Sequence, residues 1–121
     1  MSGRRDESLV LDDLVQAATR LIAVAGSLPT GTLGGNPDID EVVLWNLTLL
    51  GEASKRLSQA TRERFPDLPW QEFARTRDLV IHHYEGVRWP LVEQICANDL
   101  PALMPQLCDA RDQLGREADA G

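Results

Sequence analysis

Apolar residues recur every three or four positions through most of this chain, and this spacing constrains the fold more than any other feature. In residues 8–26 the recurring residues are Leu11, Leu14, Val15, Ala18, Leu21 and Ile22. Such spacing places side chains on one face of an α-helix. No segment alternates between apolar and polar residues for long, and no Asn-Gly pair marks a hairpin. The chain is therefore predicted to be all-α.

The longest periodic run spans residues 38–64 and predicts one continuous second helix. Asp38 or Asp40 is its expected cap, as Asp6 or Ser8 is for the first helix. The apolar stripe of this second helix consists of Val42, Trp45, Leu49, Ala53 and Leu57.

Three shorter helices are predicted after residue 66. One enters at Asp67-Leu68-Pro69-Trp70, runs to about His83 and stops near Gly86. The next begins at residues 88–90 and ends near Ala97. Asn98 or Asp99 is then expected to cap a last helix with the stripe Leu100, Leu103, Leu107 and Leu114.

Short connections between these helices predict an antiparallel up-and-down bundle of four or five helices. With 121 residues the chain suits one domain, whose ends at 1–5 and 115–121 are expected to fray. The segment LWNLTLL (44–50) is apolar nearly all the way round its helix. A bundle this small cannot bury every face of such a segment, so we expect a second copy to cover it in a homodimer. Trp70 and Trp89 are expected to be core or interface anchors.

The sequence predicts a cytoplasmic protein. It contains no long apolar run that could span a membrane, and MSGRRDESLV lacks the apolar core of a secretion signal. Cys96 and Cys108 form no CxxC motif and are expected to be buried thiols.

The net charge of −7 argues against a non-specific nucleic-acid coat, but the charge is unevenly distributed. The window 55–88 holds seven basic and five acidic residues, so it carries +2 and the rest of the chain carries −9. This window could form a phosphate-binding face. Its arginines could equally be solvated helix positions.

The segment RTRDLVIHHYEG (75–86) contains both histidines and the only tyrosine of the chain. Within it, Arg77, His82 and Tyr84 form an R-x4-H-x-Y pattern. On a straight helix Arg77 and Tyr84 share a face, whereas His82 lies roughly 140° round from Arg77. The three side chains therefore converge only if the helix ends near His82 or if a second copy supplies part of the site.

Arginine and histidine together suit metal-free cleavage of RNA. Histidine can take the proton from the attacking 2′-hydroxyl, and arginine can stabilise the negative charge at phosphorus. Asp78 could orient the arginine or a histidine. The alternative is that Arg77 is a surface residue, His82 a bundle histidine and Tyr84 a capping aromatic.

No cofactor site is predicted from the sequence. Neighbouring histidines diverge on a helix, and no cysteine or carboxylate has metal-ligand spacing. The segment GTLGG lacks the Lys-Ser/Thr of a phosphate loop and follows a helix.

Three segments together resemble the HepT family of toxins, in the HEPN superfamily of small helical proteins. They are GEASKRLS (51–58), FPDLPWQEFARTRDLVIHHYEGVRW (65–89) and ANDLPALMPQL (97–107), and they contain the R-x4-H-x-Y motif. The resemblance covers about residues 42–107, with its elements in order.

The resemblance implies a dimeric helical bundle and a bacterial toxin that is a metal-independent endoribonuclease. Arg77 and His82 would be catalytic, and two copies of the motif would form one composite cleft. The partner would be a nucleotidyltransferase antitoxin of the MNT type, which transfers AMP onto Tyr84. Asp78 fits the polar position after the motif arginine, and Glu52 either lines the cleft or belongs to a close-packing Gly51-Glu52-Ala53 segment.

Two other functions remain open from the sequence. The chain could be a non-catalytic dimeric adaptor that presents substrate or nucleotide to a nucleotidyltransferase, with Tyr84 as a contact or modification site. The same arginines could instead line a nucleotide-binding pocket.

Overall fold

The computed structural model describes residues 3–120, and within this range the chain is helical without a strand. The α-helices are α1 (Arg4–Gly26), α2 (Pro37–Arg56), α3 (Gln59–Arg64), α4 (Trp70–His82), α5 (Trp89–Gln94) and α6 (Leu100–Ala120). A 3₁₀ turn, η1 (Tyr84–Gly86), follows α4, and a π-helical segment, η2 (Ile95–Asp99), joins α5 to α6. The predicted all-α class is confirmed.

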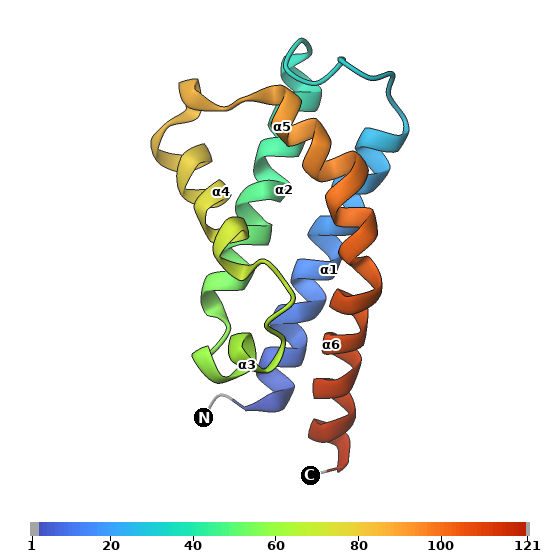
Figure 1. The fold of residues 1–121 in the computed structure, drawn as a ribbon, viewed down its shortest axis with the longest axis vertical. Helices are drawn as coiled ribbons and strands as arrows, with labels where there is room; N and C mark the ends of the chain where they lie inside the picture. The colour runs from blue at the N-terminus through green and yellow to red at the C-terminus, as the bar shows by residue number, and fades with distance from the viewer. Residues whose placement is uncertain (1–2, 121) are drawn as a thin grey trace.

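The long helices form an up-and-down bundle (Figure 1). Successive long helices α1, α2, α4 and α6 alternate in direction along the molecule. α2 packs against both α1 and α4, and α6 packs against α1. α4 is therefore held mainly by α2, and its other sides are available to form a site.

The first and last helices contribute most of their predicted stripes to the core, while Ile22 and Leu103 are only partly buried. Leu11, Leu14, Ala18 and Leu21 from α1 are buried, as are Leu100, Leu107 and Leu114 from α6. Trp70 is buried as predicted, and its Nε1 donates to the carbonyl oxygens of Phe65 and Arg62. Trp89 is half-buried against the core.

The predicted stripe of the second helix is wrong over its first half. The core takes Val43, Leu47 and Leu50, which lie on another face of α2, while Val42 and Trp45 remain exposed. Both faces carry apolar residues, so spacing alone could not decide which one the core selects. The sequence LWNLTLL is thus only partly covered within one chain.

Helix α2 also ends earlier than its periodicity predicts. Leu57 is extended and buried, and the Ser58 hydroxyl caps the separate helix α3 by accepting from the Thr61 amide. At its start, the cap of α2 is Asn36 rather than Asp38 or Asp40. Asp40 is buried and accepts a hydrogen bond from the Gly34 amide, at 2.8 Å, which fastens the preceding loop.

The predicted break at Asn98 or Asp99 does not occur. The chain stays helical from α5 through η2 into α6. Pro101 lacks the amide hydrogen that an α-helix would use there, and the wider π turn accommodates this loss without ending the helix.

The ends of the bundle are more helical than predicted. α6 continues to Ala120, although fraying was expected from residue 115. α1 begins at Arg4 with Gly3 as its cap position, and neither Asp6 nor Ser8 caps it. Residues 1, 2 and 121 lie outside the described part of the chain.

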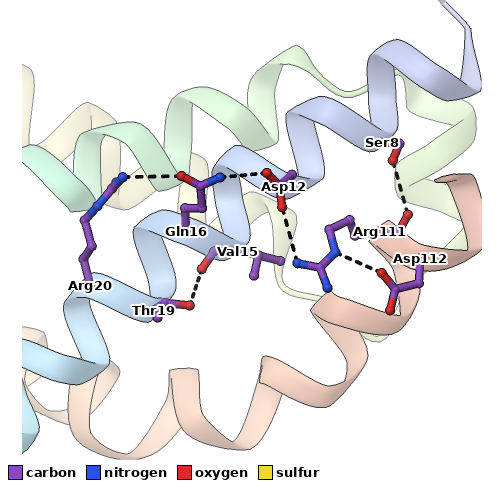
Figure 2. Close-up of polar contacts among 8 residues, drawn as sticks. All are labelled: Ser8, Asp12, Val15, Gln16, Thr19, Arg20, Arg111 and Asp112. Atoms are coloured by element: carbon purple, nitrogen blue, oxygen red, sulfur yellow. Dashed lines mark hydrogen bonds and ion pairs between the residues drawn. The ribbon is translucent and has the colours of Figure 1, made fainter.

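Polar side chains tie α1 to its neighbours along one edge (Figure 2). Arg20 donates to Gln16, Gln16 donates to Asp12, and Asp12 accepts from Arg111 of α6. Arg20 also donates to Asn46 of α2, at 3.3 Å. Within the described residues, no helix is both long and apolar enough to cross a membrane.

Candidate active site

Helix α4 ends within the R-x4-H-x-Y motif. His82 is the last helical residue, and His83 leaves the helix while its amide donates to the Leu79 carbonyl, at 2.8 Å. The Gly86 amide then donates to the His83 carbonyl and closes the turn that carries Tyr84. The predicted end of the helix between His82 and Gly86 is confirmed.

Arg77 occupies the contact between α4 and α2. A Cβ atom on Gly51 would lie 2.2 Å from the Arg77 Cβ and 2.5 Å from the Phe73 carbonyl oxygen. Only glycine permits this approach of the two helices. Glycine in a helix interior otherwise costs about 1 kcal/mol relative to alanine, so close packing accounts for its presence here.

Two carboxylates hold the Arg77 guanidinium. Its Nη1 donates to Asp78 Oδ1, at 3.0 Å. Its Nε is buried and lies 3.0 Å from Glu52 Oε2, without the alignment of a hydrogen bond. The hydrogen bond to Asp78 raises the pKa of Arg77, with a further contribution from the charge of Glu52. Asp78 therefore contacts the arginine directly, which is compatible with the first of its two predicted roles.

Of the two interpretations of the Gly51-Glu52-Ala53 segment, the structure supports close packing of the helices, and the lining of a cleft by Glu52 stays a prediction. Gly51 allows the helices to pack closely, and Glu52 contacts the motif arginine from the next position of α2.

Lys55 also belongs to this cluster, and the sequence interpretation did not single it out. Its ammonium group donates to Asp78 Oδ1, at 2.7 Å, so Lys55 and Arg77 share one oxygen atom. The hydrogen bond from Lys55, then that from Arg77, lowers the pKa of Asp78. The available signal was the spacing: Lys55 follows Gly51 by one helical turn and so lies on the same side of α2.

His82 and Tyr84 are exposed beyond this cluster. The Tyr84 side chain is 59% exposed. Within residues 3–120, no hydrogen bond or ion pair joins His82 or Tyr84 to Arg77 or to Asp78. One chain thus assembles Arg77, Asp78, Glu52 and Lys55, but it does not bring the histidine and tyrosine onto the guanidinium.

Three basic residues of the window 55–88 lie beside carboxylates outside the Arg77 cluster. Arg56 lies 3.8 Å from Asp13 of α1, Arg75 lies 3.9 Å from Glu72, and Arg64 pairs with Glu117 of α6. Lys55 and Arg77 converge on Asp78, and this pair is the part of the predicted phosphate-binding face that the contacts support.

No metal centre is formed by the part of the chain that the structure describes. There, no group of three or more histidine, cysteine, aspartate or glutamate side chains is arranged to hold a metal ion.

The fold and the site together define a class: a small helical bundle with an arginine fixed at a helix contact, and with a histidine and a tyrosine exposed near the end of the same helix. A family model described as ribonuclease HepT-like matches residues 15–109. The chain belongs to this HepT-like family, as its resemblance indicated.

Individual relatives agree with this assignment. A candidate RNase of Methanocaldococcus jannaschii is 29% identical over 86% of this chain and 95% of its own length. A candidate ribonuclease HepT of Thermococcus cleftensis is 38% identical over 50% of this chain and 56% of its own length. A longer M. jannaschii protein, named as a γ-glutamylcyclotransferase and candidate RNase, is 31% identical over 64% of this chain and 35% of its own length. No solved structure matches the chain significantly.

Proposed function

We propose that this chain is a metal-independent RNA endonuclease whose complete active site forms between two copies. The observation that carries the proposal is the placement of the motif in a member of the HepT-like family. Arg77 is fixed at the helix contact, while His82 and Tyr84 project from the end of the same helix.

The chemistry requires only groups that the chain carries. His82 accepts the proton of a 2′-hydroxyl, and the resulting oxygen attacks the neighbouring phosphorus. The bond from phosphorus to the 5′-oxygen breaks, leaving a 2′,3′-cyclic phosphate and a 5′-hydroxyl. A second histidine or a water molecule protonates the leaving oxygen. Arg77 stabilises the additional negative charge on the phosphoryl oxygens.

The apolar surface of α2 supports a composite site. Val42 and Trp45 are exposed, and Glu52 lies two turns beyond Trp45 on the same side of the helix. Glu52 in turn contacts Arg77. A second copy that covers this apolar surface would come close to the arginine, and its His82 could complete the site.

The biological setting of the proposal is a toxin–antitoxin pair in the cytoplasm. A nucleotidyltransferase antitoxin of the MNT type would silence the nuclease by transferring AMP to Tyr84. The exposure of this phenol supports the proposal, because a transferring enzyme must reach the hydroxyl. The attached phosphate would also compete with RNA for the nearby cations.

Cleavage of RNA in the presence of EDTA tests the activity. The unaltered protein should produce fragments that end in a cyclic phosphate, as read by mass spectrometry. Arg77→Ala and His82→Ala should each lower the rate at least about 100-fold, the scale on which general acid–base and electrostatic groups contribute. Circular dichroism should show that both variants remain folded.

The same experiments distinguish the adaptor. If the purified protein accepts AMP on Tyr84 but never cleaves RNA, the chain is an adaptor of the transferase and the nuclease proposal is wrong. Full activity in both Arg77→Ala and His82→Ala would contradict the assignment of the site. Calorimetry with ATP and AMP tests the remaining nucleotide-pocket alternative.

A further inference from the structure

Lys55 and Arg77 come from different helices and meet at a single oxygen atom. The Lys55 ammonium on α2 and the Arg77 Nη1 on α4 both donate to Asp78 Oδ1, at 2.7 and 3.0 Å. Two cations that approach one anionic oxygen from two sides have the arrangement needed to hold a phosphate oxygen. In the structure, the Asp78 carboxylate occupies the position between the two cations.

We infer that Lys55 is a second phosphate-binding residue of the site, that it grips the same phosphodiester as Arg77, and that Asp78 is displaced by this phosphate. The inference rests on the proposed function, which supplies the RNA. It adds a substrate contact outside the R-x4-H-x-Y motif and gives Asp78 the role of a built-in competitor of the substrate.

The exposure of the cluster makes the exchange feasible. The side chains of Lys55 and Asp78 are 39% and 47% exposed, so an incoming phosphate can reach both cations. An exposed ion pair contributes only about 0–1 kcal/mol, and a phosphate can therefore replace the carboxylate at little cost. Arg77 keeps capacity for the ligand, because a guanidinium has five N–H donors and its Nη1 group makes the hydrogen bond to Asp78.

The chain also limits how far these cations can move. Gly51 holds the backbone of α4 against α2, so the Arg77 and Lys55 backbones keep a fixed separation. Glu52, at 3.0 Å from the Arg77 Nε, restrains the guanidinium on the side away from Asp78. When the two cations lose their contact with Asp78, they become available to the phosphate and stay close to each other.

RNA binding in a non-cleaving background tests the inference. Each variant is combined with His82→Ala. Its affinity for a fluorescein-labelled single-stranded RNA is then measured at salt concentrations from roughly 50 to 300 mM, a range wide enough to determine how steeply affinity falls with salt. Adding Lys55→Gln should weaken binding about tenfold and reduce the slope of log affinity against log salt by about 0.7–1. Adding Asp78→Asn should strengthen binding, because it removes the competing charge and keeps the side-chain shape.

The matched control is Arg116→Gln on α6, a helix that packs mainly on α1. It removes the same charge and should leave affinity and slope within about twofold of the His82→Ala parent. Equal losses in Lys55→Gln and Arg116→Gln, or unchanged binding in Lys55→Gln, would overturn the role of Lys55 while leaving an active nuclease in place. If the unaltered protein neither cleaves nor binds RNA, the proposed function fails first, and this inference fails with it.

Discussion

At the scale of single residues, Gly51 decides where Arg77 lies. Its replacement by alanine would place a methyl group 2.2 Å from the Arg77 Cβ and 2.5 Å from a backbone oxygen, neither of which is a flexible end. We expect Gly51→Ala to destabilise the fold by about 1–3 kcal/mol in urea unfolding, the usual cost of overpacking. RNA cleavage should fall as well, because the guanidinium is displaced.

Gly26→Ala is the matched control for this substitution. Gly26 is also helical, but no atom lies within 4 Å of the position that a Cβ atom would take there. The change should be neutral or stabilising by up to about 1 kcal/mol, because alanine restricts the unfolded chain more than glycine does. Equal losses in both variants would show that the helix contact does not depend on Gly51.

The two cysteines should differ in reactivity. Burial, and secondarily the charge of Glu93, raises the pKa of Cys96 to about 12, so this thiol is almost entirely protonated at pH 8. Cys108 is partly exposed. We expect iodoacetamide to label Cys108 in the native protein and Cys96 only after unfolding, as read by peptide mass spectrometry. Labelling of Cys96 first would contradict the packing of η2 against the core.

The residues of the site were predictable from local sequence, but their pairings were not. Arg77, His82 and Tyr84 stand out because rare residue types fall within one short segment. The pairing of Lys55 with Asp78 joins positions that are 23 residues apart, and it depends on how α2 and α4 are packed. Helical spacing places a residue on a face of its own helix and does not specify the neighbouring helix.

At the scale of elements, the short helix α3 is fastened to α1 by one carboxylate. Glu7 accepts from the Ser58 amide, at 2.5 Å, and from the hydroxyls of Ser58 and Thr61. Burial alone would raise the pKa of Glu7, but the hydrogen bonds from Thr61 and Ser58 outweigh it and lower the pKa below the usual 4.5. The carboxylate form is therefore the one that stabilises the native state.

This attachment makes a prediction for pH. A lowered pKa contributes stability above pH 4.5, and this contribution is lost as the pH falls through the native pKa of Glu7. Glu7→Gln should cost about 1 kcal/mol at pH 7 in urea unfolding, because a neutral amide is a weaker acceptor. The difference between the two proteins should shrink below pH 4.5. A difference that stays constant down to pH 3, roughly one unit below the ordinary value of a carboxyl, would show that the charge is unimportant.

Helix existence followed from the sequence more readily than helix boundaries. The stripes of α1 and α6 predicted their core faces, because each has one apolar side. The boundary between α2 and α3 was missed because the periodicity continues through Leu57, and only the cap at Ser58 separates the helices. The break predicted at Asn98 was wrong because both a cap and a π turn can accommodate a following proline.

At the scale of the whole molecule, the exposed side of α2 should determine the oligomeric state. Trp45 is 62% exposed in the single chain, so Trp45→Glu should leave the stability of the monomer within about 0.5 kcal/mol. If this surface joins two copies, the buried charge should convert the dimer to monomers in sedimentation experiments. RNA cleavage should be lost together with the dimer.

Leu9→Glu provides the comparison. Leu9 is 59% exposed on α1, so the two substitutions place a charge at similarly accessible apolar positions. A dimer that survives Trp45→Glu but dissociates in Leu9→Glu would place the contact on α1. A protein that is monomeric before any substitution would contradict the composite site.

The up-and-down arrangement of the helices places the two ends of the chain far from the end of α4. The start of α1 and the end of α6 lie at one pole of the molecule, and η1 with the end of α4 lies toward the other (Figure 1). A fluorophore, a surface tether or an additional domain attached at Arg4 or Ala120 would therefore stand away from His82 and Tyr84. The architecture thus leaves one pole free for attachment, away from the end of α4.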